Sequence, residues 1–294
     1  NCNNFNVNKM VTKRAGKARY QSRKDASSKG QLELLTGLAL SQKSFEKIST
    51  HCNKIGIEFL STAFDSKSLS FLVNEIGLKT LKISSGEITN APFLIEHAVS
   101  GADLILSTGM ANLSEIESAL SVIAYGFIGP LIENPSDNDF LKAYYSEEGQ
   151  KILKKKVKVL HCTTEYPTKM EEVNLKAMIS LKNAFKLKVG YSDHTKGNAV
   201  SIAAVALGAS VIEKHFTSDK RMKGPDHLAS LSPMELKKFI EDINDTVIAL
   251  GSGVKIPQKS EFENMVPARK SLIAKIKIKR GEIFSKENLG VMRP

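Results

Sequence analysis

The sequence predicts a parallel α/β fold of the barrel type, and three observations support this prediction. Short β-branched runs alternate with helical patterns along most of the 294 residues. Each run is nearly continuously apolar at its start, as expected of a strand buried on both faces. Each run then enters polar residues, and polar chemistry at the carboxyl ends of parallel strands marks the active face of an α/β barrel. The predicted strands are Glu58–Thr62, Thr80–Ser84, Asp103–Ser107, Val157–Cys162, Lys188–Ser192 and Val211–Phe216.

Helix signals between these strands agree with this fold. Ser114 and Glu117 form a capping-box pattern ahead of an apolar helical face. The run from Ser232 to Glu235 supplies a capping serine, a proline in the first turn and a glutamate three residues after the cap. A helix over Asn198–Leu207 is followed by a glycine that ends it. Further helices are predicted at Gln31–Leu40 and Ser44–Cys52.

The number of predicted strands does not decide whether the sheet closes into a barrel. Six strands are predicted, whereas a closed barrel needs eight, so either the sheet is open or two βα units lie upstream. Asn3–Gly30 is predicted as a polar loop, and Tyr125–Lys156 as a polar insertion on the rim with a helix of its own. We assign residues 1–250 to the barrel, 251–267 to a linker, and 268–294 to the start of a small β-rich domain that opens with the alternating run Ser271–Lys279.

The chain is basic, with a formal net charge of +11. Such a balance favours an anionic partner: a phosphorylated substrate, nucleic acid or a membrane surface. The lysines are scattered, however, and the run Lys154–Lys156 is interpreted as a solvated helix end. No clustered basic helix favours nucleic acid, and Ser201–Ile212, the longest weakly polar stretch, is too short to span a bilayer. Three cysteines without metal-like spacing, and no visible secretion signal, favour a reducing, cytoplasmic location.

Two of the six histidines lie at the ends of neighbouring predicted strands. His194 follows the strand that ends at Ser192, and His215 lies at the end of the next one. Adjacent strand ends bring the two imidazoles close together, where they can form half of a coordination shell for Mn²⁺, Zn²⁺ or Fe²⁺. The alternative is a pair of hydrogen-bonded histidines without a metal.

A lysine at the end of another strand predicts an anion site. Lys82 lies in a mostly apolar strand, where a cation is costly unless it meets an anion, and Ser85 and Gly86 follow it with further donors. A Schiff-base lysine and a lysine that extends to solvent are the alternatives. His161 and Cys162 are neighbours along a strand and therefore point to opposite faces, which argues against a cysteine nucleophile paired with this histidine.

Together these segments resemble the sialic acid synthase family, which includes legionaminic and pseudaminic acid synthases. The segments that carry the resemblance are Phe59–Asp65, Lys82–Asn90, Leu106–Met110, His161–Pro167, Gly190–Thr195, Glu213–Thr217 and Gly224–Asp226. The resemblance implies a (β/α)₈ TIM barrel followed by a β-rich antifreeze-like (SAF) domain. It further implies that the first strand and most of the second, with a catalytic glutamate and a phosphoenolpyruvate-binding lysine, precede Asn1, and that the SAF domain is truncated.

The resemblance also implies roles for the polar strand ends. Phosphoenolpyruvate would be bound by Thr62, Lys82, Ser85, Thr164 and Ser192. The sugar would contact Glu87, Tyr166, Asp226 and Arg293, with Glu87 and Tyr166 also catalytic. A divalent metal, Mn²⁺ first and Mg²⁺ or Co²⁺ as alternatives, is expected on His194 and His215. Because the matching arginine reaches across a dimer in the family, a domain-swapped homodimer is expected.

The implied activity is that of an N-acetylneuraminate synthase in cell-surface polysaccharide biosynthesis. This transferase condenses phosphoenolpyruvate with the open-chain aldehyde of N-acetylmannosamine and releases phosphate by C–O cleavage. A diacetamido-trideoxy hexose, giving legionaminic or pseudaminic acid, is the alternative acceptor. A further alternative is a truncated remnant that does no chemistry, since the expected catalytic glutamate has no counterpart.

Overall fold

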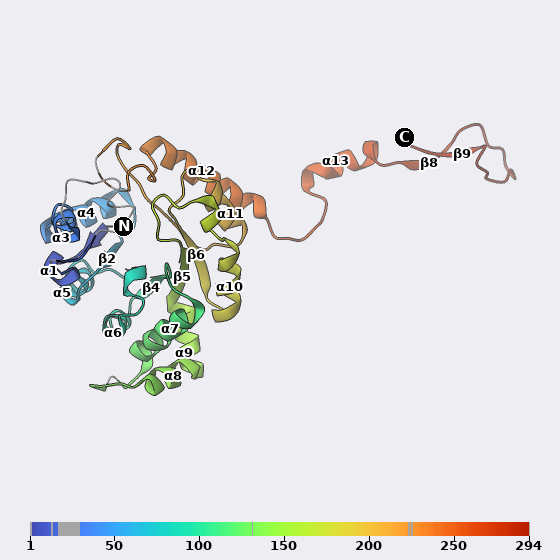
Figure 1. Cartoon of the computed structure of the whole chain (residues 1–294). Helices are drawn as coiled ribbons and strands as arrows, with labels where there is room; N and C mark the ends of the chain where they lie inside the picture. Colours follow the sequence, from blue (N-terminus) through green and yellow to red (C-terminus); the bar gives the residue numbers. More distant parts are fainter. Residues whose placement is uncertain are drawn as a thin grey trace. The chain divides into compact units, whose positions relative to one another are not determined.

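A curled, parallel seven-stranded sheet forms the frame of the larger part of the chain, as the computed structural model shows in Figure 1. The structure describes residues 2–12, 14–16, 30–130, 132–222, 224 and 226–293. The chain divides into two units, Asn1–Ala249 with this sheet and Leu250–Pro294 with a two-stranded sheet. Residues 17–29 of the predicted polar loop, and Pro225 in one of the segments that carry the resemblance, lie outside the described residues.

The strands of the large sheet follow one another in sequence order, and every neighbouring pair is parallel. This arrangement brings all the carboxyl ends to one edge of the sheet. The six predicted strands are confirmed, with shifts of a few residues at their ends. The observed strands are β1 Cys2–Asn4, β2 Ser61–Ala63, β3 Thr80–Ile83, β4 Asp103–Ser107, β5 Val157–Cys162, β6 Lys188–Asp193 and β7 Ile212–Lys214.

Strand β1 corrects the prediction of a loop over Asn3–Gly30. Its three residues are polar or small and carry no strand pattern, but they pair with β2 in the register Asn3↔Thr62 and Asn4↔Ala63. Pairing with a neighbour thus overrides local preference. The described sheet is curled and barrel-like, with seven strands and with β1 and β7 at its ends. The eighth strand of a TIM barrel, which the resemblance places before Asn1, stays a prediction.

Helices follow the strands and cover the sheet (Figure 1). The predicted cap at Ser232 is confirmed, since Ser232 N donates to Glu235 Oε2 at 2.8 Å. The predicted box at Ser114 is corrected by two residues, because Asn112 and Glu115 cap each other instead. The α-helices among the described residues of the larger unit are α1 Val7–Met10, α3 Gln31–Thr36, α4 Gln42–Ile55, α5 Ser66–Ser70, α6 Ala91–Val99, α7 Leu113–Ile128, α8 Asp137–Tyr145, α9 Glu147–Lys156, α10 Lys176–Phe185, α11 Ala199–Ala206 and α12 Pro233–Leu250.

The insertion before β5 is helical and packs on α7. It consists of α8 and α9, which begin at capping serines Ser136 and Ser146. Lys154–Lys156 forms the last turn of α9, as predicted. Because α9 leads directly into the start of β5, the insertion lies at the amino ends of the strands, away from the edge where the predicted site residues gather.

The smaller unit contains α13 Lys259–Ala268 and an antiparallel pair, β8 Ser271–Ala274 with β9 Leu289–Met292. Helix α13 overlaps the stretch 251–267 predicted as a linker. The assignment of this unit to an antifreeze-like domain stays a prediction. In the part of the chain that the structure describes, no helix is long and apolar enough to cross a membrane.

Candidate active site

A charged and hydroxyl-bearing cluster lies at the carboxyl ends of β2, β3, β6 and β7. Lys82 Nζ is 3.4 Å from Glu213 Oε1, and the lysine side chain is only 11% exposed. The same glutamate oxygen accepts a hydrogen bond from Ser192 Oγ at 2.7 Å. Thr62 is buried opposite Lys82 in the register of β2 and β3. Three residues predicted to bind phosphoenolpyruvate therefore share one edge of the sheet.

Glu213 is a member of this cluster that the sequence analysis missed. Burial alone would raise the pKa of its carboxyl group, but Lys82 and the Ser192 hydroxyl outweigh burial and hold that pKa below the usual value. Glu213 is therefore ionised at neutral pH. A signal was present in the sequence, because Glu213 precedes His215 by two residues on a strand and so shares its face.

A second group of predicted residues converges on Gly109. Ser85 Oγ accepts a hydrogen bond from Gly109 N at 2.9 Å and lies 3.4 Å from Cys162 Sγ. A Cβ atom at Gly109 would collide with Thr164 Oγ1 and would lie 2.9 Å from Ser85 Oγ. Ser85 and Thr164 thus stand on either side of a position where only glycine fits.

The geometry does not support Cys162 as a nucleophile activated by His161. Burial raises the pKa of the Cys162 thiol, which keeps it protonated. His161 turns the other way, with Nε2 at 2.8 Å from the carbonyl oxygen of Val173. The prediction that these two neighbours point to opposite faces is confirmed.

The two predicted metal-binding histidines lie close together under an aromatic ring. The ring centroids of His194 and His215 are 5.3 Å apart and nearly perpendicular. Tyr166 lies against both, with centroid distances of 4.1 Å to His194 and 5.3 Å to His215. The strand ends of β6 and β7 and the segment after β5 therefore meet at this point.

His194 is arranged as a neutral imidazole whose Nε2 lies 3.4 Å from Ser192 Oγ. Its Nδ1 lies 2.7 Å from the carbonyl oxygen of Thr163, which can only accept, so Nδ1 carries the hydrogen and Nε2 the lone pair. Burial lowers the pKa of His194 to about 4, although the bond to Thr163 opposes this shift. Burial also lowers the pKa of His215, against the opposing effect of Asp226. Both rings are neutral near pH 7.

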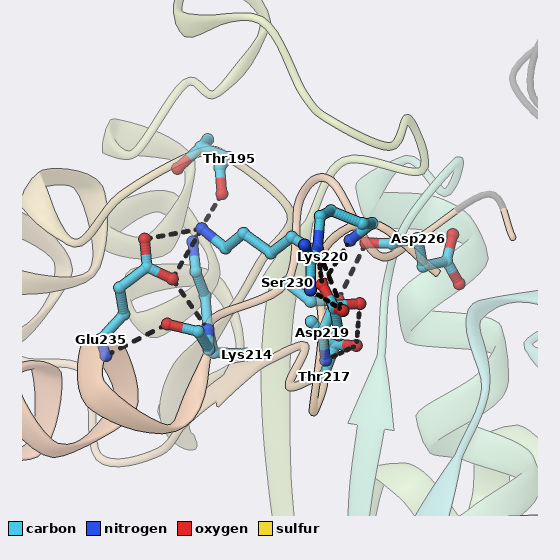
Figure 2. Close-up of polar contacts among 10 residues, drawn as sticks. Thr195, Lys214, Thr217, Asp219, Lys220, Asp226, Ser230 and Glu235 are labelled. Atoms are coloured by element: carbon cyan, nitrogen blue, oxygen red, sulfur yellow. Dashed lines mark hydrogen bonds and ion pairs between the residues drawn. The ribbon is translucent and has the colours of Figure 1, made fainter. Parts of the chain in front are cut away.

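Asp226 adds a carboxylate beside the histidines. Its Oδ2 lies 3.8 Å from His215 Nδ1, and its Oδ1 is buried without a hydrogen-bond partner. The loop after β7 holds this residue, since Ser230 Oγ donates to the Asp226 carbonyl at 2.8 Å and Thr217 Oγ1 donates to that of Asp219 (Figure 2).

These donors fit a divalent ion. Two neutral imidazoles and a buried, unpaired carboxylate oxygen are a donor set that Mn²⁺ accepts. Among the described residues, no group of three or more His, Cys, Asp or Glu side chains is already gathered around one point. Water and substrate would therefore complete the shell, and the metal stays a prediction.

Glu87 and Arg293 are the other two predicted sugar contacts. Glu87 is half-buried in the short turn after β3 and accepts a hydrogen bond from Asn90 Nδ2 at 2.8 Å. Arg293 follows β9 in the smaller unit and is exposed. Its contact with the sugar, and the homodimer that this contact implies, stay predictions.

A barrel-like parallel sheet with a lysine, hydroxyls and neutral histidines at its carboxyl edge is typical of enzymes that act on small anionic substrates. The profile of the NeuB family matches residues 2–255, and the chain belongs to this family. The predicted family is thereby confirmed. The chain is an enzyme of the transferase type, like the synthases it resembles.

Its relatives point to one branch of the family. The chain is 49% identical to the N,N'-diacetyllegionaminic acid synthase of Campylobacter jejuni over 99% of its own length and 79% of the relative. It is 41% identical to the synthase of the same name from Legionella pneumophila, over 99% and 75% of the two chains. A crystal structure of N-acetylneuraminic acid synthetase from Leptospira borgpetersenii matches with a TM-score of 0.68 and 30% identity, over 90% of this chain and 78% of that one.

Proposed function

We propose that this chain condenses phosphoenolpyruvate with a 2,4-diacetamido-trideoxy hexose to give N,N'-diacetyllegionaminic acid and phosphate. The observation that carries the proposal is the 49% identity over 99% of the chain with the Campylobacter jejuni synthase of that product. This acceptor replaces N-acetylmannosamine, the first expectation from the sequence. Lys82, Ser192 and His194 lie at or just beyond the carboxyl ends of neighbouring strands of the sheet, which supports the proposal.

Phosphoenolpyruvate would bind where Lys82 lies. The lysine cation is nearly buried and is held beside Glu213, so it is already desolvated and oriented when an anion arrives. The hydroxyls of Thr62, Ser85, Thr164 and Ser192 surround this region and can donate to the phosphate and carboxylate oxygens. Charge-assisted bonds of this kind are roughly twice as strong as neutral ones.

The sugar would enter on the side of the histidines. A divalent ion held there by His194 and His215 would supply polarisation of the aldehyde oxygen. Tyr166 covers both rings and limits access of water to the aldehyde. Glu87 and Asp226 would contact the rest of the sugar.

The condensation balances with water as the only further reactant. C3 of phosphoenolpyruvate forms a bond to the aldehyde carbon, and the aldehyde oxygen takes up a proton and becomes a hydroxyl. Water adds to the positive C2 and loses a proton, for which the ionised Glu213 is a suitable acceptor. The C2–O bond to phosphate then breaks as the new hydroxyl gives up its proton, which leaves a keto acid and inorganic phosphate.

The test is a comparison of two acceptors. The purified chain is supplied with phosphoenolpyruvate, Mn²⁺ and either the diacetamido sugar or N-acetylmannosamine, and phosphate release is followed. We expect the diacetamido sugar to give the higher kcat/KM. Equal or better turnover of N-acetylmannosamine would overturn the proposed acceptor. Release of no phosphate with either sugar would favour the inactive remnant instead.

A further inference from the structure

A buried ion pair is formed by the two residues that directly precede His194 and His215 in the chain, Asp193 and Lys214. Asp193 and Lys214 are partners in the register of β6 and β7, one residue beyond the Ser192–Glu213 pair that faces the site. Since side chains alternate along a strand, Asp193 and Lys214 point to the opposite face of the sheet. Lys214 Nζ lies 2.9 Å from Asp193 Oδ2, and the two side chains are 3% and 0% exposed. No other ion pair among the described residues is as deeply buried.

This pair holds the peptide that follows His194. Asp193 Oδ1 accepts hydrogen bonds from Thr195 N at 2.8 Å and from Thr195 Oγ1 at 2.7 Å. Lys214 Nζ donates to the carbonyl oxygen of Thr195 at 2.6 Å, a contact drawn in Figure 2. Thr195 is fully buried, so the pair satisfies both polar groups of its backbone where water cannot. Ser201 on α11 donates to Asp193 Oδ2 and ties the pair to that helix.

Each member of the pair is the chain neighbour of a histidine. His194 lies between Asp193 and Thr195, both of which the pair fixes. His215 directly follows Lys214, and its carbonyl accepts from Leu231 N at 2.8 Å. A bond between Asp193 and Lys214 therefore locks the ends of β6 and β7 together at the point where the two imidazoles must converge.

We infer that Asp193 and Lys214 are positioning residues that set the separation of His194 and His215 and keep His194 in one tautomer. They act through the Thr195 peptide and the strand ends. The inference rests on the proposed function only for the identity of what the histidines bind. Partners that orient metal-binding histidines from behind commonly change metal affinity by about 10–100-fold when removed.

The decisive variant carries both Asp193→Asn and Lys214→Met. The asparagine still accepts from Thr195 and leaves no buried charge unpaired, while the methionine keeps the length of the lysine but cannot donate to the Thr195 carbonyl. The matched control is Asp103→Asn with Lys156→Met. Lys156 makes the same kind of contacts, with Asp103 Oδ1 at 3.1 Å and the Gly101 carbonyl at 2.7 Å, but at the opposite edge of the sheet.

Two readouts are needed on the full chain. The first is the imidazole ¹⁵N spectrum of His194 in metal-free protein, assigned with His194→Gln, which reports the tautomer and requires neither metal nor substrate. The second is the affinity for Co²⁺, used as the probe ion. We expect the double variant to remain folded, to show a mixture of His194 tautomers and to bind Co²⁺ about 10–100-fold more weakly. The control should behave as wild type in both.

A double variant with the wild-type tautomer and wild-type Co²⁺ affinity would overturn the inference, because the pair would then only stabilise the fold. If the double variant does not fold, Thr195→Val removes one bond to Asp193 with little change in volume. It should shift both readouts in the same direction by a few-fold, and unchanged readouts would again refute the inference. If wild type does not bind Co²⁺, the proposed metal fails while the tautomer readout still decides the inference.

Discussion

Replacement of Lys82 by methionine tests the anion site at its centre. The side chain keeps its length but loses the cation that lies 3.4 Å from Glu213 and is 11% exposed. A charge-assisted hydrogen bond contributes about 1.5–3 kcal/mol, which corresponds to about a 10–150-fold loss of phosphoenolpyruvate affinity. Sugar affinity should change far less, because Tyr166 and Asp226, two of the predicted sugar contacts, lie beside the histidines.

Calorimetric titration with each substrate separately measures this difference. The control is Lys188→Met, which removes the same charge from the exposed amino end of β6. We expect the control to bind phosphoenolpyruvate as wild type does. Equal phosphoenolpyruvate affinity in Lys82→Met, or an equal loss in the control, would refute the assignment of Lys82 to the substrate anion.

Three further predictions follow from single positions. Gly109→Ala should weaken phosphoenolpyruvate binding and cost about 1–3 kcal/mol of stability, because the new methyl group displaces the hydroxyls of Thr164 and Ser85. Gly86→Ala has open space around the new methyl group and should leave the stability in urea unfolding unchanged. Burial lowers the pKa of His97 from 6.5 to about 4, so the folded state takes up its proton later than the unfolded chain as the pH falls. Stability should therefore be full above pH 6.5 and fall by about 3 kcal/mol towards pH 4, and His97→Phe should remove this part of the loss in pH-dependent unfolding. His215→Ala should abolish binding of a divalent ion, and unchanged metal stoichiometry would contradict the assignment.

The sequence predicted the sheet well because its strands are buried on both faces. Leu104, Leu106, Val159 and Leu160 are fully buried in β4 and β5, and such continuous apolar runs are readable without a structure. Strand β1 could not be read in this way, because only its pairing with β2 makes it a strand. The predicted cap of α7 shifted by two residues because Asn112 and Glu115 form the capping box in place of Ser114 and Glu117.

The sequence predicted those parts of the site that follow from the positions of the strand ends. Strand ends brought His194 and His215 together, as expected from adjacent parallel strands. The roles of Glu213 and of the Asp193–Lys214 pair depend on cross-strand register, since a shift of one residue would exchange the two faces. Register is fixed by the packing of the whole sheet, and local sequence does not contain it.

The fate of one oxygen atom tests the central claim most directly. Phosphoenolpyruvate labelled with ¹⁸O in the bridging C–O–P position is incubated with the diacetamido sugar, Mn²⁺ and the purified chain, and the products are analysed by mass spectrometry. A synthase that adds water at C2 and breaks the C2–O bond releases phosphate that carries the label, together with an unlabelled nine-carbon keto acid. Label retained on the three-carbon fragment, or the absence of a condensation product, would contradict the proposed function.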